Sequence, residues 1–161
     1  MDVNMVFEIY PKKGAGVINF GMKKDEVNNL LGVSDDYIID NNHRLIEFRS
    51  DMNISYTADP DGRVFHIGFS KGMNFVTFDS VNIFHDNPDV VIKKLIEYDN
   101  YPYLSLGMVF FMKLGITLTG FHDDDSDQKS LVVFNHSEYE QYIDDMELFI
   151  DAMNDKYHKT F

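Results

Sequence analysis

The chain contains no cysteine and no tryptophan, and it has few positively charged residues. Its 161 residues include 14 Lys and Arg against 27 Asp and Glu, which gives a formal net charge of −13. The absence of cysteine excludes disulfide bonds, thiol catalysis and thiolate metal sites. Because phosphate binding needs clustered Lys and Arg, the charge argues against nucleic acid and anionic membranes as partners.

Long hydrophobic runs are also missing. A membrane-spanning helix needs roughly 20 apolar residues, and no run in this chain approaches that length. The segment Met1–Asn4 lacks the basic start and apolar core of a signal peptide. We therefore expect a cytoplasmic protein.

Hydrophobic residues are nevertheless abundant, at 44% of the chain, with 14 Phe and 9 Tyr. A chain of this size can bury roughly 70% of the surface that its unfolded form exposes. We expect one globular unit over residues 1–161, in which the acidic surface either maintains solubility or steers a basic partner.

The same succession of patterns occurs twice. Val17–Phe20 and Val81–Phe84 each precede a polar entry and a helical pattern, and three strand-like segments then follow in each half. The residues that favour helix boundaries include Gly32 as a C-terminal stop, and Asn87 with Pro88 as an N-terminal start. We predict pseudo-repeats over 1–70 and 75–135. The expected strands are 3–10, 45–48, 52–57, 64–69, 75–84, 108–112, 116–121 and 131–134.

The last segment predicts a helix over 137–158. Ser137 and Glu140 have the spacing of a capping box, and apolar residues then recur at helical intervals as far as Tyr157. This stripe is expected to cover a sheet face, although it would also suit a partner or a dimer contact. The predicted fold class is α+β, with two repeated helix-plus-antiparallel-meander units that form a continuous or paired antiparallel sheet, on which the C-terminal helix packs.

Sequence patterns of catalysis or metal binding are weak. The histidines lack the His-x-His or His-x-x-x-His spacing of a zinc pair, no serine occupies a Gly-x-Ser-x-Gly elbow, and Gly14-Ala-Gly16 lacks the rest of a nucleotide-binding motif. Asp123, Asp125 and Asp127 have the spacing of the first calcium ligands of an EF-hand. Gln128 and Phe134 then stand where that loop needs Gly and Glu. We expect no enzyme, no metal and no cofactor.

One segment resembles a known signature. Gly21-Met-Lys-Lys-Asp-Glu-Val-Asn-Asn-Leu-Leu-Gly32 is similar to the Gly-Met-Thr-x-x-Glu-Val-x-x-Leu-Leu-Gly pattern of small helix-plus-meander modules. These modules include small outer-membrane assembly lipoproteins, the β-lactamase-inhibitor-protein family, which has two in tandem, and several bacterial toxin-immunity proteins. The chain differs at Lys23, where the pattern has Thr, and it has no cysteine for lipidation.

The resemblance implies an immunity-type inhibitor that binds and neutralises a toxin domain, and the acidic composition suits a basic nuclease as that toxin. The alternatives are a non-catalytic binding or scaffold module and a small enzyme with its site between two sheets. The candidate partner-binding residues are loop carboxylates and aromatic anchors: Asp59, Asp61, Tyr101, Tyr103, Asp123, Asp124, Asp125 and Asp127.

Overall fold

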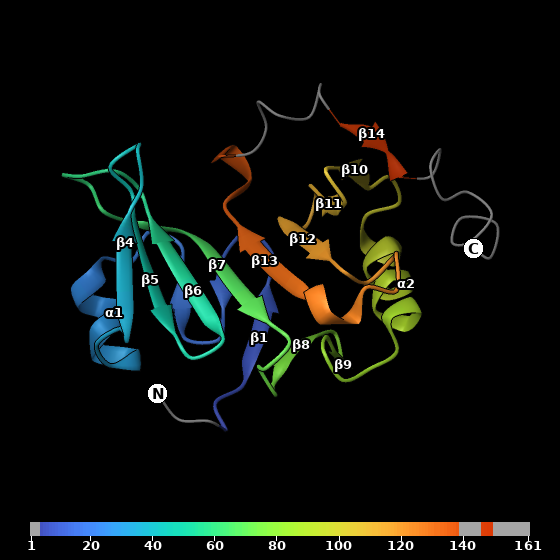
Figure 1. Cartoon of the computed structure of the whole chain (residues 1–161), viewed down its shortest axis with the longest axis horizontal. Coiled ribbons are helices and arrows are strands. Elements are labelled where there is room, and N and C mark those ends of the chain that lie inside the picture. Colours follow the sequence, from blue (N-terminus) through green and yellow to red (C-terminus); the bar gives the residue numbers. More distant parts are fainter. Residues whose placement is uncertain (1–3, 139–145, 150–161) are drawn as a thin grey trace.

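The computed structural model describes residues 4–138 and 146–149 (Figure 1). The first half of the chain contains β1 (Phe7–Tyr10), β2 (Gly14–Ala15), β3 (Ile18–Asn19), α1 (Lys24–Leu31), β4 (Asp36–Ile39), β5 (Leu45–Arg49), β6 (Met52–Tyr56) and β7 (Val64–Ser70). The second half contains β8 (Val76–Phe78), β9 (Val81–Asn82), α2 (Pro88–Tyr98), β10 (Tyr103–Ser105), β11 (Met108–Phe111), β12 (Ile116–Thr119), β13 (Ser130–Phe134) and β14 (Glu147–Leu148). Short 3-10 turns occupy Ser126–Gln128 and His136–Glu138.

The strands form two sheets. The larger has nine strands in the order β14-β10-β11-β12-β13-β7-β6-β5-β4, and the smaller has five in the order β3-β2-β1-β8-β9. Every pairing in the large sheet is antiparallel, whereas β1 and β8 in the small sheet run parallel. The predicted α+β class with mostly antiparallel strands is therefore confirmed.

The two meanders join into one continuous sheet at its centre. Strand β7 pairs with β13, with Ser70 opposite Ser130 and His66 opposite Phe134. Each meander follows a helix in chain order, α1 before β4–β7 and α2 before β10–β13. The equivalence of the two halves as repeats stays a prediction.

Several expected strands have different bounds. The single strand expected over 75–84 is a hairpin of β8 and β9, which turns at Asp79 and Ser80 with positive φ angles of 43° and 68°. Strands β4 and β10 were not predicted, because four and three residues are too few to show a clear alternation. Both pair with strands that the sequence does predict, so tertiary pairing decides their conformation.

The helix expected over 137–158 lies mostly outside the described residues. Among its described residues a 3-10 turn ends at Glu138 and Phe149 is helical, but the prediction is wrong at Glu147 and Leu148, which form strand β14. Glu147 and Leu148 instead extend along β10, with Leu148 opposite Tyr103. This pairing adds β14 to the edge of the large sheet.

Helix α1 begins and ends where its sequence indicates. Lys23 has no side-chain acceptor for the first N–H groups, but its own N–H donates to Glu26 Oε1 at 3.2 Å, which is the return half of a capping box. Gly32 ends the helix with a φ of 83°. Val27 and Leu31 are buried, whereas Leu30, three residues after Val27, is 44% exposed.

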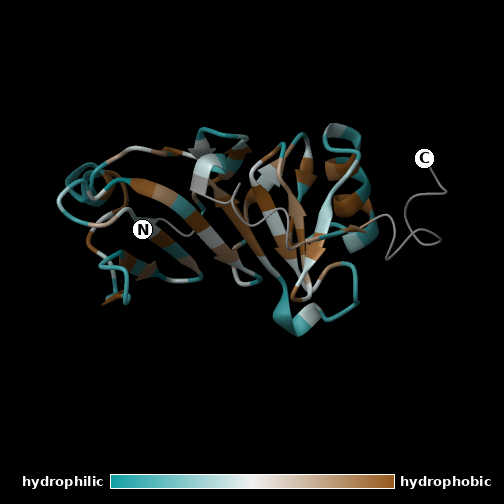
Figure 2. Cartoon of the chain, turned by 90° about the horizontal axis from the view of Figure 1, so that it is seen from above, coloured by the Kyte–Doolittle hydropathy of each residue, from teal (hydrophilic) through white to brown (hydrophobic). Residues whose placement is uncertain are grey.

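Helix α2 is also capped as predicted, since Asn87 accepts a hydrogen bond from the N–H of Asp89 and Pro88 is the first helical residue. Figure 2 shows that hydrophobic residues gather along the strands and that the connecting loops are hydrophilic. The main core joins the inner face of the large sheet to both helices and the small sheet. Its fully buried large side chains are Phe7, Ile9, Ile18, Met52, Ile54, Tyr56, Phe69, Phe111, Phe121 and Phe149.

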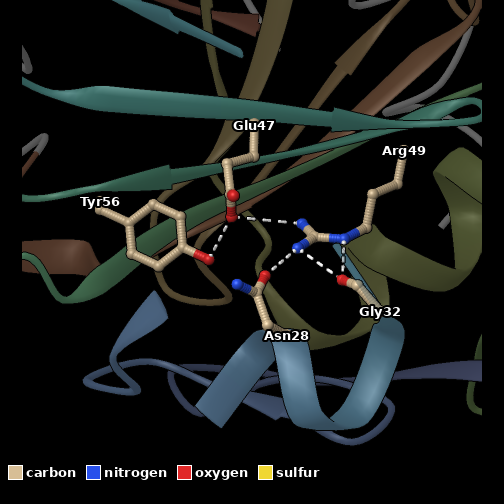
Figure 3. Close-up of polar contacts among 5 residues, drawn as sticks. All are labelled: Asn28, Gly32, Glu47, Arg49 and Tyr56. Atoms are coloured by element: carbon tan, nitrogen blue, oxygen red, sulfur yellow. Dashed lines mark hydrogen bonds and ion pairs between the residues drawn. The ribbon is translucent and has the colours of Figure 1, made fainter. Parts of the chain in front are cut away.

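A buried network of charged and polar groups joins α1 to the large sheet (Figure 3). The carboxylate of Glu47 accepts hydrogen bonds from the Tyr56 hydroxyl at 2.6 Å and from Arg49 at 3.3 Å. Arg49 also donates to Asn28 Oδ1 at 2.8 Å and to the carbonyl oxygen of Gly32. Because α1 has no basic residue in its last turn, Arg49 supplies the positive charge that the C-terminal end of a helix favours.

Candidate functional site

The two groups of loop carboxylates lie at opposite ends of the central strands. Asp59 and Asp61 precede β7, while Asp123 to Asp127 precede β13, and these two strands are antiparallel neighbours. The start of one strand is therefore beside the end of the other. The structure does not bring the two predicted groups into one cluster.

The loop between β12 and β13 presents Asp123, Asp124, Asp125 and Asp127, all of them exposed. Asp127 forms a surface ion pair of 3.2 Å with Lys71, which follows β7. Within residues 4–138 and 146–149, no three His, Asp or Glu side chains converge in a way that would hold a metal ion. The arrangement is an exposed acidic loop that the Asp127–Lys71 ion pair joins to the segment after β7.

Asp59 and Asp61 have a different setting. They line a hollow of about 230 Å³ together with Lys23 and Lys24 at the start of α1. Asp25 also lines the hollow, so the two lysines offset two of its three carboxylates. Of the two loops, the one between β12 and β13 therefore has the stronger local negative charge.

Tyr101 and Tyr103 line a groove of about 500 Å³ at the edge of the large sheet. Asp99 is only 2% exposed and links two segments that line the groove. One of its carboxylate oxygens accepts a hydrogen bond from the N–H of Tyr101 at 3.2 Å, and the other accepts one from the N–H of Lys113 at 3.1 Å. The other lining residues are Met112, Lys113, His136 and Leu148. These come from segments that only strand pairing brings together, so sequence spacing could not have identified them.

The outer face of the large sheet, opposite the main core, carries a mixture of polar and apolar side chains. Side chains alternate between the two faces of a strand, and residues that lie opposite each other on neighbouring strands share a face. His66 therefore lies on the outer face together with its two opposite residues, Phe134 and Ser55. Near β10 to β13 these side chains form a small apolar cluster, separate from the main core, and the central residues of this cluster, Phe110, Met112 and Phe134, are buried. Its members are Tyr103, Met108, Phe110, Met112, Val132, Phe134 and Met146.

Towards β4 this outer face contains a hollow of about 350 Å³. Its lining residues are Asp40, Arg44, Ile46, Phe48, Asn53, Ser55, Phe65 and His66. The guanidinium of Arg44 lies over the ring of Phe65, 4.9 Å from its centre. The hollow thus offers an apolar wall, amide, hydroxyl and imidazole groups, the Asp40 carboxylate and the Arg44 cation.

His66 is the titratable group at the floor of this hollow. Its Nδ1 lies 3.5 Å from the Ser55 hydroxyl, at the limit of a hydrogen bond. Burial lowers the pKa of His66 to about 4, so the imidazole is neutral at physiological pH. Within the described chain no carboxylate bonds to His66, so this pair lacks the third member of a catalytic triad.

No protein-family model, no curated protein and no solved structure matches this chain. Among the described residues, no helix is both long and apolar enough to span a membrane. The sequence analysis named Tyr103 on the outer face but missed the rest of that surface. The period-two alternation of the strands was the available signal, but which face lies opposite the helices depends on where the helices pack.

Proposed function

We propose that this chain is an immunity-type inhibitor, a protein that binds a basic toxin domain and blocks its active site. The observation that carries the proposal is the hollow around His66 on the outer face of the nine-stranded sheet, with the exposed apolar residues Ile38 and Phe48 at its margin. Exposed surfaces that combine apolar side chains with a polar rim are typical of protein-binding sites.

The dimensions of this face suit one partner. Strand β7 has seven residues, which span roughly 23 Å at about 3.3 Å per residue. A standard interface buries roughly 800 Å² on each partner, a patch about 30 Å across. One domain that lies across β7 and β13 would therefore reach the acidic loops at both ends of the strands.

Charge supports a basic partner. The net charge of −13 and the exposed loop at Asp123 to Asp127 attract a positively charged protein and accelerate its association at low salt. A toxin that cleaves nucleic acid has such a surface, because it must bind phosphate. The acidic inhibitor would occupy the site that the nucleic acid needs.

The test is capture of partners by the tagged full chain from its native host, followed by an activity assay on the recovered protein. The expected result is a basic domain in equal amount, whose toxic activity the chain abolishes. In the hollow, Asn53→Arg should weaken that complex, whereas Val90→Arg, on the exposed side of α2, should leave it unchanged. Recovery of no toxic domain, or inhibition unaffected by Asn53→Arg, would contradict the proposal.

The loop carboxylates have a separate test. Replacing Asp123, Asp124, Asp125 and Asp127 by Asn should slow association with the toxin at low salt and reduce its dependence on ionic strength. Unchanged association at low salt would remove this loop from the interface. A complex insensitive to salt in both forms would instead favour the alternative of a mainly apolar scaffold contact.

A further inference from the structure

Strand β4 ends the nine-stranded sheet, and its outer side pairs with no other strand in the described part of the chain. All four of its residues are exposed. Three of them are large and apolar: Tyr37, Ile38 and Ile39 are 58%, 51% and 62% exposed. Proteins usually shorten, charge or cover such an edge, because its free backbone groups can pair with another chain.

The backbone N–H and C=O groups of successive residues in β4 point alternately towards β5 and away from it. The N–H of Asp40 donates to the carbonyl of Arg44 at 3.0 Å, which continues the ladder with β5. By the alternation of an antiparallel pair, Ile38 also bonds towards β5, and Tyr37 and Ile39 turn their backbone groups outward. The Tyr37 N–H accordingly donates to the Asp36 side chain at 2.8 Å, and not to β5.

The charges beside this edge argue against a second copy of the chain. Asp35, Asp36 and Asp40 flank the apolar residues. An antiparallel pair of two β4 strands with Tyr37 opposite Ile39 would set Asp36 against Asp40 at both ends. Like charges that face each other across strands are destabilising, and each copy carries a net charge of −13.

We propose that β4 receives an extended segment of a basic partner protein as an additional antiparallel or parallel strand. The segment has apolar residues at its centre and Lys or Arg on either side, where it meets Asp35, Asp36 and Asp40. Its backbone bonds to the outward N–H and carbonyl groups of Ile39 and to the carbonyl group of Tyr37, whose N–H donates to Asp36. The inference rests on the proposed function in that the occupant is a segment of the protein partner.

The edge is continuous with the outer face. Ile38 lies opposite Ile46, and the next residue of β5 on the same side is Phe48, which is 37% exposed. Ile46 and Phe48 both line the hollow around His66. A partner bound to the outer face at this hollow can therefore also reach the open edge of β4.

The test selects short random peptides from a displayed library on the wild-type full chain. Selected peptides should alternate apolar residues, carry flanking Lys or Arg, and lack proline. Ile39→Pro removes an outward N–H and should weaken their binding by about tenfold or more, whereas Ile39→Thr, which keeps the N–H, should retain most of it. Equal binding of the selected peptides to the Ile39→Pro variant, or no selection above background, would overturn the proposal.

A second measurement uses the wild-type protein, so that it does not depend on the folding of a variant. Bound peptide should slow amide hydrogen exchange at Ile39. A third measurement does use a variant: replacement of Asp35, Asp36 and Asp40 by Asn, which keeps the oxygen acceptors in these loops, should weaken the binding of the peptide. The proposal would be overturned if the bound peptide slowed amide exchange at residues outside β4. It would also be overturned if the chain formed a dimer that Ile39→Pro dissociates.

The two proposals fail in different ways. If a toxin domain is captured equally well by Ile39→Pro, the immunity function stands and the strand addition is wrong. If basic peptides bind at β4 but no toxin is inhibited, the strand addition stands and the immunity function is wrong.

Discussion

The guanidinium group of Arg49 donates two hydrogen bonds to the carbonyl oxygen of Gly32, from Nε at 3.1 Å and from Nη2 at 3.0 Å. The two residues belong to strand β5 and to the end of helix α1, and Arg49 also pairs with buried Glu47 (Figure 3). One cation therefore satisfies a helix terminus and a buried carboxylate at once. This places α1 on the inner face of the sheet, opposite the proposed binding face.

Arg49→Met should lower the free energy of unfolding by about 3–5 kcal/mol, because it leaves Glu47 charged and buried without its cation. Urea denaturation measures this change. Arg63→Met is the matched control, since exposed Arg63 also donates to a carbonyl oxygen, that of Gly21 at 2.9 Å. The control should cost about 1 kcal/mol or less. If both variants lose a similar free energy of unfolding, the buried Glu47–Arg49 pair contributes no more to stability than the exposed hydrogen bond of Arg63.

His66 should make stability depend on pH. Its pKa is about 4 in the folded protein and 6.5 as the reference value, so the unfolded chain binds more protons between these values. The contribution is present above pH 6.5 and is lost as the pH falls to 4, a change of about 3 kcal/mol. His66→Gln should flatten the pH dependence of unfolding across this window. A wild-type His66 that titrates near 6.5 by NMR would contradict the assignment.

Two glycines with similar backbones should respond differently to alanine. Gly107 and Gly115 have φ angles of 78° and 69°. A Cβ on Gly107 meets no atom within 4 Å, whereas one on Gly115 would lie 2.6 Å from the carbonyl oxygen of Phe134. Gly107→Ala should therefore cost about 1 kcal/mol of strain and Gly115→Ala clearly more, about 2–4 kcal/mol. Thermal unfolding of both variants measures the two changes in stability. Equal decreases would show that the backbone at Phe134 shifts without cost to make room for the added Cβ.

Proline substitutions at two adjacent positions of β4 should show which backbone N–H bonds to β5 and which faces outward. Ile38→Pro removes an N–H that bonds to β5 and should destabilise the protein by about 3 kcal/mol, whereas Ile39→Pro should cost about 1 kcal/mol or less. Urea denaturation of the two variants provides the measurement. If Ile39→Pro proves the more damaging, the outward orientation of Ile39 is wrong.

Local sequence predicted the elements whose signals are local. Asn87 and Pro88 mark the start of α2, Gly32 marks the end of α1, and both helices and the longer strands form near their predicted positions. Each of these signals depends on hydrogen bonds or backbone angles within a few residues. The same kind of reasoning proposed Tyr101 and Tyr103 as partner-binding residues, which stays a prediction, and it did not predict the groove that they line.

Tertiary structure alone decided the rest. The joining of β7 to β13 makes one sheet from two meanders and separates the acidic loops, and no local pattern encodes that pairing. Strands β4 and β14 exist because a neighbour offers them backbone hydrogen bonds. Composition by itself determined an acidic chain without thiol chemistry. Which carboxylates share a surface, which sheet face lies opposite the helices and which strand edge stays unpaired depend on contacts between residues far apart in the chain.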